Sequence, residues 1–321
     1  MSTITAGLPL GGLLGAVWLR HRTALLTVLA VLAGVCALLL VSGLYVHAGY
    51  RSSGAAACDP SLLECNRVWK DFIRGWGAPL MVGNTVLYLF GGAVGAFVGG
   101  PLVAREFEYG TFRFAWTQGA GRSRFTVGGL ALAGTVLAGA TALVGVVLAW
   151  WNEPMARQGG RFSPALFVEG APALAGRALL AFGCAALAGA VLRRTVVAVG
   201  AGLVASVAVT FVAEAMRFHY RTPLEDTVHT LMQTSVDQRW TGSTWFSDPA
   251  GNRIGSDALF DLGKGFDDAE RLVRDGGYAV HEVYQPADRY WSFQAVEFGW
   301  MALLGLAACA GAVWWLRRRA A

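Results

Sequence analysis

Charged residues are scarce in this sequence. Asp, Glu, Lys and Arg make up 15% of its 321 residues, whereas soluble domains carry about 25%. Hydrophobic residues make up 55%, and the mean hydropathy is +0.47. Several apolar runs reach the length of about 20 residues that crosses a bilayer. The shortage of charge therefore excludes an ordinary soluble domain and predicts an integral membrane protein.

Motifs for nucleotides, metals and hydrolysis are also missing. The sequence has no G-x-x-x-x-G-K-[ST] loop, so we expect the chain to bind no nucleotide cofactor by itself. His281-Glu282 lacks the second histidine of H-E-x-x-H, and no Cys/His cluster has zinc spacing. The spans contain no Ser/His or paired-carboxylate arrangement, and no basic soluble face suits nucleic acid. We expect no metal, no catalytic residue and no nucleic-acid partner.

Cysteines are few. Cys36, Cys184 and Cys309 lie in apolar runs and fit the role of small apolar fillers. Cys58 and Cys65 flank a short loop on the predicted outer side, where an oxidising environment permits a disulfide. Two free thiols are the alternative. The first residues lack the basic region and cleavage site of a signal peptide, so we expect none.

The apolar runs predict an all-α integral membrane protein with six transmembrane helices. Their expected ranges are 23–46, 76–103, 125–151, 171–192, 196–213 and 291–316. We divide the chain into a membrane domain with the first five helices (1–214), an extracytoplasmic insert (215–290), and the sixth helix with a basic tail (291–321).

The distribution of arginine predicts the topology. The segments expected in the cytoplasm hold eleven of the 26 Lys/Arg residues and only two of the 21 Asp/Glu residues. Lys and Arg gather on the cytoplasmic side, so both termini should be cytoplasmic. These segments are 1–23, 104–124, 193–195 and 317–321.

The first residues predict an interfacial helix that leads into the first span, because apolar residues recur there at helical spacing. A frayed tail is the alternative. The apolar positions are Leu10, Leu13, Leu14, Val17 and Trp18.

The insert is the one region polar enough to fold in water. Thr222-Pro223-Leu224-Glu225 has the form of a capping box and predicts a helix to about Val236. Asp267–Arg274, followed by Gly276-Gly277, predicts a second helix. We expect a modest extracytoplasmic cap of helices with room for one hairpin.

Polar residues within the spans are costly and are therefore functional candidates. Arg177 lies in the fourth span, and Gln294 and Glu297 lie in the sixth, so we consider them a candidate substrate path. Arg177 could instead extend to the outer surface. Glu297 could reach outer water, or pair with Arg177 or Arg289.

The second span contains Gly91, Gly95 and Gly99, a stripe of small residues at helical spacing that lets another helix approach closely. The approaching helix could belong to the same chain or to a second copy.

The stretch 105–124 is too polar for hydrocarbon and too aromatic for a plain loop, which predicts a short helix at the membrane surface. Its acids, Glu106 and Glu108, could bind a partner with a polar or basic groove. The alternative is local ion pairing with Arg105 and Arg113.

Two motifs carry a resemblance. The pattern E-x-E-x-G-T-x-R resembles the first cytoplasmic loop of type-2 ABC transporter permeases; here it comprises Glu106, Glu108, Gly110, Thr111 and Arg113, with Arg105 before it. The run Y-x-P-x-x-R-Y-W-x-F-Q, which starts at Tyr284, resembles the last outer loop and final helix of actinobacterial members. The long insert departs from the shorter outer loops of many members.

The resemblance implies a permease subunit of an exporter in the cell membrane. In that family the loop is a coupling helix that docks into an ATPase, and the ATPase binds ATP and Mg. It also implies a second permease copy or homologue, a dimer of ATPase subunits, and an amphipathic or hydrophobic substrate. The alternative is a non-transporting membrane sensor or immunity protein whose outer domain binds a ligand.

Overall fold

The computed structural model describes residues 10–58, 65–108, 122–229, 231, 239–263 and 265–319. These residues are mostly helical, and six segments are long and apolar enough to cross a membrane. The segments are Val17–Ser52, Arg67–Glu108, Arg124–Trp151, Ala171–Leu192, Thr195–Arg217 and Ala287–Arg318. The prediction of six spans is therefore confirmed.

The first two spans differ in detail from the prediction. Helix α1 (Leu10–Ser52) is continuous, so the expected interfacial helix and the first span form one element. The second span consists of α2 (Asn66–Leu87) and α3 (Phe90–Glu108), with a break at Tyr88 and Leu89. A short 3-10 helix, η1 (Ala55–Ala57), follows α1.

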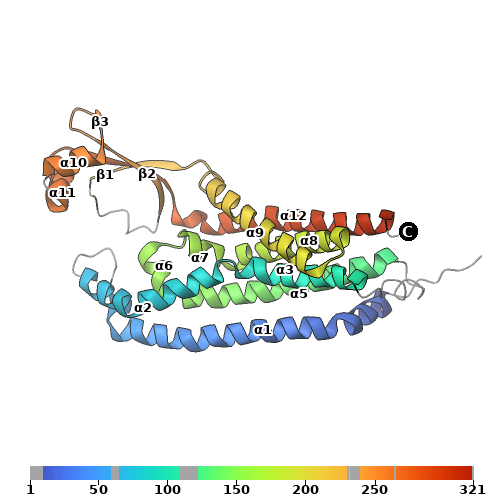
Figure 1. Ribbon diagram of the computed structural model, residues 1–321. Helices are drawn as coiled ribbons and strands as arrows, with labels where there is room; N and C mark the ends of the chain where they lie inside the picture. The colour runs from blue at the N-terminus through green and yellow to red at the C-terminus, as the bar shows by residue number, and fades with distance from the viewer. Residues whose placement is uncertain are drawn as a thin grey trace, which may run out of the picture.

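In the described part of the chain, the remaining helices of the bundle comprise four long spans and two short helices between them. They are α5 (Arg122–Trp151), the short helices α6 (Glu153–Gly159) and α7 (Pro164–Val168), α8 (Ala171–Leu192), α9 (Thr195–Arg217) and α12 (Tyr290–Arg319). The 3-10 helix η4 (Ala287–Arg289) precedes α12. The start of α1 and the end of α12 lie at the same end of the bundle (Figure 1).

Helix α8 is the centre of the bundle, because it is the most buried of the spans and packs against α3, α5, α9 and α12. Small residues permit this packing. A Cβ atom on Gly95 or Gly99 of α3 would clash with the backbone carbonyls of Ala178 and Phe182 on α8. The glycine stripe of α3 therefore packs inside this chain.

The insert, the chain between α9 and α12, contains a four-stranded antiparallel sheet in the order β1-β4-β2-β3. Its elements are β1 (Leu224–Val228), β2 (Trp240–Ser247), β3 (Arg253–Ile254), α10 (Ser256–Gly263), α11 (Phe266–Asp275) and β4 (Ala279–Gln285). The two helices and the sheet enclose a core of their own: Val228, Phe246, Leu259, Ala269, Val273 and Val280.

The predicted helix from Thr222 is wrong. Residues Leu224–Val228 form β1, which pairs along its whole length with β4. The local capping signal was outweighed by this pairing, which buries Val228 against the insert's core. The second predicted helix is confirmed by α11, which ends just before Gly276.

The bundle has two ends, and the insert lies beside one of them (Figure 1). We call the end beside the sheet the insert end. We call the opposite end, where the first turns of α1, the last turn of α3 and the end of α12 lie, the basic end.

Candidate functional site

At the basic end, the last turn of α3 is bonded to two other spans. The Nη2 of Arg20 on α1 donates to Glu106 Oε1 at 2.8 Å. Glu108 accepts hydrogen bonds from the backbone N of Thr195 at 2.7 Å and from its Oγ1 at 2.6 Å. Thr195 is the first residue of α9, so the Glu108 carboxylate satisfies a backbone N–H that the helix itself leaves unpaired.

The tight turn between α8 and α9 supports this arrangement. Arg193 has a left-handed backbone (φ 57°), which reverses the chain within two residues. Its guanidinium lies 5.2 Å from the centre of the Phe107 ring. The turn is thereby held against the end of α3, next to Glu108.

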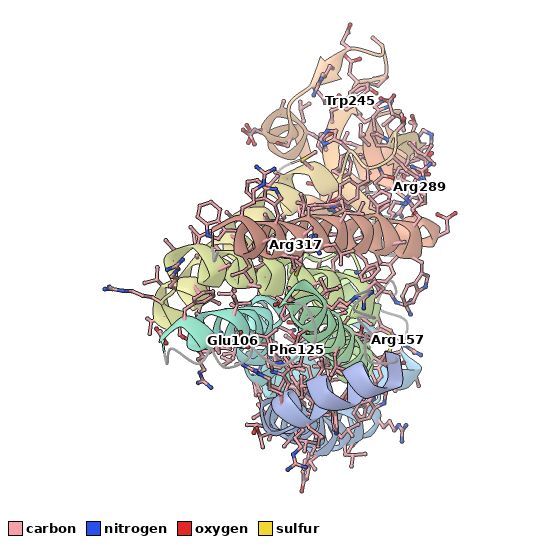
Figure 2. The ribbon with its side chains drawn as sticks, turned by 90° about the vertical axis from the view of Figure 1, so that its right-hand side faces the viewer. Glu106, Phe125, Arg157, Trp245, Arg289 and Arg317 are labelled. Carbon is pink, nitrogen blue, oxygen red and sulfur yellow. A yellow bond between two sulfur atoms is a disulfide. The ribbon has the colours of Figure 1, made fainter. Side chains whose placement is uncertain are left out.

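Figure 2 looks onto the basic end and labels Glu106, Phe125 and Arg317. Arg20 also lies 5.3 Å above the Phe125 ring, so one guanidinium contacts both α3 and α5. A recess of about 490 Å³ opens beside it, between α1 and α3, and is lined by Arg20, Arg105 and Glu106 at its polar edge.

The sequence left local pairing of the two acids with Arg105 and Arg113 as an alternative. Among the residues that the structure describes, the partners of Glu106 and Glu108 are Arg20 and Thr195. Gly110, Thr111 and Arg113 lie outside the described residues, so the proposed coupling segment is seen only from Arg105 to Glu108.

At the insert end, three charged side chains meet in the interior. Glu297 on α12 forms ion pairs with Arg177 on α8 and with Arg217 on α9, the latter at 3.0 Å from Nε to Oε2. The three side chains are at most 2% exposed. We call them the buried triad. One carboxylate thus bonds three spans together, and the triad carries an excess of one positive charge.

Other groups help to hold the two cations. Arg177 Nη1 donates to the carbonyl of Val168 at 2.9 Å. The Arg217 guanidinium lies 4.0 Å from the centre of the Phe167 ring. A carbonyl dipole and a ring face both favour positive charge, which partly offsets the cost of burying two arginines near one acid.

Sequence reasoning missed Arg217, because the fifth span was predicted to end at Ala213. The helix continues to Arg217. Ser206, Thr210, Ala213 and Arg217 are all buried on α9 at intervals of four, three and four residues. This spacing keeps them on one face of a helix, and it was the signal that could have extended the span.

The structure brings the three residues of the candidate substrate path into one region. Arg177 and Glu297 form a direct ion pair, which is one of the alternatives that the sequence left open for Glu297. Gln294 is fully buried one turn away, where its Nε2 donates to the Phe167 carbonyl at 2.7 Å and its Oε1 accepts from the Ala173 N–H at 3.0 Å. Arg289, the other candidate partner of Glu297, donates instead to the carbonyl of Thr222.

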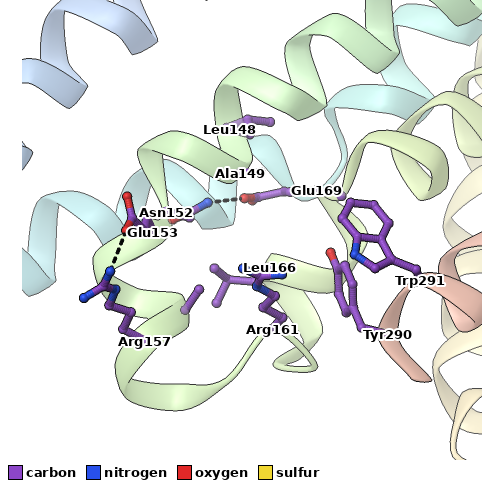
Figure 3. Close-up of a pocket in the computed structure, with 12 residues that line it drawn as sticks. Leu148, Ala149, Asn152, Glu153, Arg157, Arg161, Leu166, Glu169, Tyr290 and Trp291 are labelled. Atoms are coloured by element: carbon purple, nitrogen blue, oxygen red, sulfur yellow. Dashed lines mark hydrogen bonds and ion pairs between the residues drawn. The ribbon is translucent and has the colours of Figure 1, made fainter. Parts of the chain in front are cut away.

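A second buried acid, Glu169, lies at the insert end beside a cavity of about 320 Å³ (Figure 3). Its Oε2 accepts a hydrogen bond from Asn152 Nδ2 at 2.8 Å, and Asn152 exchanges two hydrogen bonds with Asn84. Burial raises the pKa of Glu169 to about 8, against the opposing effect of the Asn152 hydrogen bond. Nothing in the sequence marks Glu169 as a candidate site residue.

The insert end also contains a disulfide. The sulfur atoms of Cys58 and Cys65 are bonded to each other, while Cys36, Cys184 and Cys309 are free. Trp69 Nε1 donates to the Cys58 carbonyl at 3.1 Å, which holds Cys58 against α2. We expect both bridged cysteines to resist alkylation until the protein is reduced.

Within the described part of the chain, no three His, Cys, Asp or Glu side chains are grouped so that they could hold a metal ion.

A protein-family model described as "ABC-2 membrane transporter related" matches residues 29–217, which is more than half of the chain and extends from α1 to the end of α9. No curated protein and no solved structure matches the chain.

Proposed function

Because the chain belongs to the ABC-2 membrane transporter related family, we propose that it is the transmembrane permease subunit of a type-2 ABC exporter in the cell membrane. A separate ATPase subunit supplies the energy and binds ATP and Mg. Two permease subunits, identical or homologous, form the path together. The substrate is amphipathic or hydrophobic, in keeping with the apolar, glycine-rich spans.

The observation that carries the proposal is the bonding of the last turn of α3 to two other spans. Glu106 pairs with Arg20 of α1, and Glu108 caps α9 at Thr195. A force applied to the segment after α3 is therefore passed directly to α1 and α9. Rigid-body movement of packed helices is a common way to convert such a local push into a global change.

In this mechanism the residues from Arg105 to Arg113 contact the ATPase, with Arg105, Glu106 and Glu108 at the start of the contact and Gly110, Thr111 and Arg113 beyond it. Closure of the two ATPase subunits on ATP tilts α3 together with α1 and α9. The path between the two permeases then opens toward the insert side. We assign Arg177, Gln294 and Glu297 to the wall of that path in its open form.

The proposal can be tested with the ATPase encoded beside the permease gene. The two proteins should copurify, and Glu106→Lys with Glu108→Lys should abolish copurification while leaving membrane insertion intact. Arg20→Ala and Thr195→Val form a matched pair, because they remove the side-chain partners of the acids and leave the acids themselves. Both should retain the ATPase, as should Glu225→Lys on the exposed edge of the insert.

If the charge reversals leave copurification unchanged, the acids are not the contact. If Arg20→Ala and Thr195→Val lose the ATPase as completely as the reversals do, the acids act by shaping the helix end rather than by binding.

One observation favours the second candidate, a non-transporting sensor or immunity protein. The insert has a sheet, two helices and a core of its own, as a ligand-binding outer domain would. A sensor needs no ATPase, so the same copurification experiment decides between the exporter and the sensor.

The segment that starts at Tyr284 and resembles actinobacterial members lies outside the residues that the family model matches. That resemblance therefore stays a prediction.

A further inference from the structure

The cavity beside Glu169 lies where three spans end or begin (Figure 3). Its wall comes from the end of α5, from α6, from the segment around Leu166, and from Tyr290 and Trp291 at the start of α12. Trp291 is 62% exposed. Tryptophan and tyrosine prefer the headgroup level of a bilayer, so this cavity opens at the depth of lipid headgroups.

The floor of the cavity holds a carboxyl group with one free oxygen. Glu169 is 2% exposed, and its Oε2 is fixed by Asn152, which Asn84 fixes in turn. Its Oε1 is buried and has no hydrogen-bond partner among the described residues. Buried polar atoms in folded proteins are nearly always bonded, so such an atom calls for an explanation. A ligand with an N–H donor supplies one.

The rim of the cavity is positive. Arg157 forms an ion pair with Glu153 at 3.3 Å. Arg161 is exposed and has no acidic partner in the described part of the chain. A guanidinium group matches the geometry of a phosphate. The same cavity thus offers an acceptor for a donor at its floor and a cation for an anion at its rim.

We propose that this cavity binds the phosphoethanolamine headgroup of a bilayer phospholipid. The ammonium group donates to Oε1 of Glu169, the phosphate lies against Arg161, and Tyr290 and Trp291 flank the linking methylenes. The cavity volume is at the lower end of the range of about 300–1,000 Å³ that is typical of small-molecule sites, which suits a headgroup whose acyl chains stay in the bilayer. This proposal does not depend on the transport function.

Competing headgroups differ from this one in a single feature each. Phosphocholine keeps both charges but its quaternary nitrogen has no N–H to donate. Phosphoglycerol keeps the phosphate but has no cation. A cavity that reads a cationic N–H donor together with the phosphate therefore prefers phosphatidylethanolamine to either lipid. Choline loses the buried hydrogen bond, and the glycerol hydroxyls can donate only without a positive charge.

Binding should also be linked to proton release. Because burial raises the pKa of Glu169 to about 8, the free carboxyl is mostly protonated at pH 7, and an ammonium donor favours the ionised form. The proton leaves to water when the lipid binds. Affinity should then rise about tenfold for each pH unit from pH 6 to 7.5. The other ionisable groups that line the cavity are Glu153, Arg157, Arg161 and Tyr290.

The test uses the full-length chain purified in detergent and titrated with dioctanoyl lipids that carry each of the three headgroups. Thermal unfolding and native mass spectrometry report binding. The ethanolamine lipid should bind at least tenfold more tightly than the choline or glycerol lipid at pH 7.5. Glu169→Gln should lose this preference and the pH dependence together. Arg161→Gln should weaken the binding of the ethanolamine lipid and of the glycerol lipid to the same extent. Asp71→Asn, an exposed control on α2, should leave the binding of both lipids unchanged.

Equal binding of the ethanolamine and choline lipids by the wild-type chain would overturn the proposal, and so would a Glu169→Gln variant that keeps the preference. If Glu169→Gln does not fold, the comparison of the three lipids and the pH series on the wild-type chain still decide the question.

Discussion

The two ends of the helical bundle hold their charges in opposite ways. At the insert end, Glu297 is bonded to Arg177 and Arg217 out of reach of water, with at most 2% of each side chain exposed. At the basic end, the Arg20–Glu106 pair keeps 33% and 27% of its side chains exposed. An exposed pair can change partners at small cost, whereas breaking a buried pair leaves an uncompensated charge.

This difference suggests a division of labour along the bundle. The buried triad fixes α8, α9 and α12 to one another at the insert end. The partly exposed Glu106 and the exposed Glu108 of α3 are bonded, but loosely enough for another protein to take over their bonds. A movement that starts at the basic end is therefore expected to meet its largest resistance at the insert end, where the packing around the buried triad must open before these side chains can line the path.

Glu297→Gln should produce the largest loss of stability. The change leaves two guanidinium groups buried with a neutral partner, which costs about 3–5 kcal/mol when one member of a buried pair is removed. Thermal unfolding in detergent measures the effect. Asp71→Asn is the matched control, because it breaks the exposed pair with Arg74 and should cost less than about 1 kcal/mol. Equal losses in the two variants would erase the contrast between buried and exposed charge.

The second prediction concerns pH at the insert end. The pKa of Glu169 is about 8 in the folded chain and has a reference value of 4.5. Between these values the folded state holds a proton that the unfolded state releases. Stability should therefore fall as pH rises, by about 1.4 kcal/mol per pH unit from Glu169 alone. The difference between wild type and Glu169→Gln in unfolding experiments from pH 5.5 to 7.5 measures it. Parallel pH curves for the two proteins would refute the raised pKa.

The middle of the bundle should respond to a single methyl group. Gly99→Ala places a Cβ against the Phe182 backbone of α8, which cannot move aside easily, and should destabilise the chain by about 1–3 kcal/mol. Gly200→Ala on α9 meets no atom within 4 Å and should gain up to about 1 kcal/mol from better helix propensity. A loss at Gly200 as large as at Gly99 would contradict the packing explanation, because the methyl group added at Gly200 meets no neighbouring atom.

The smallest effect is expected at the basic end. Glu106→Gln removes the charge that pairs with Arg20 but leaves both side chains partly in water, so the loss of stability should stay below about 1 kcal/mol. Comparison with Glu297→Gln in the same unfolding experiment sharpens the contrast between the two ends. A loss as large as that of Glu297→Gln would show that the basic end is as rigid as the insert end.

The sequence predicted the six spans because long apolar runs leave the chain few alternatives. It did not predict the break at Tyr88 and Leu89, since the residues on both sides stay apolar and the break has no Gly or Pro at its site. The strand β1 was read as a helix because a local signal was visible while its partner, β4, lies more than 50 residues away in the sequence.

The candidate site was predictable only in part. Arg177 and Glu297 stood out because charge is rare within apolar runs. Arg217 and Glu169 lie where spans meet polar segments. The helical spacing from Ser206 could have extended the fifth span to Arg217, but nothing in the sequence marks Glu169 as buried. Their burial follows from tertiary packing: Arg217 meets Glu297 from another helix, and Glu169 is enclosed by Asn152 and the start of α12.

The measurement that tests the account most directly is site-specific photocrosslinking from position 105, at the exposed end of α3, and from position 225, on the edge of the insert. The account predicts crosslinks to the neighbouring ATPase from position 105 only, with a yield that changes when ATP is added. Crosslinks from position 225, or none from position 105 in a complex that copurifies, would contradict the assignment of the basic end as the site of ATPase contact.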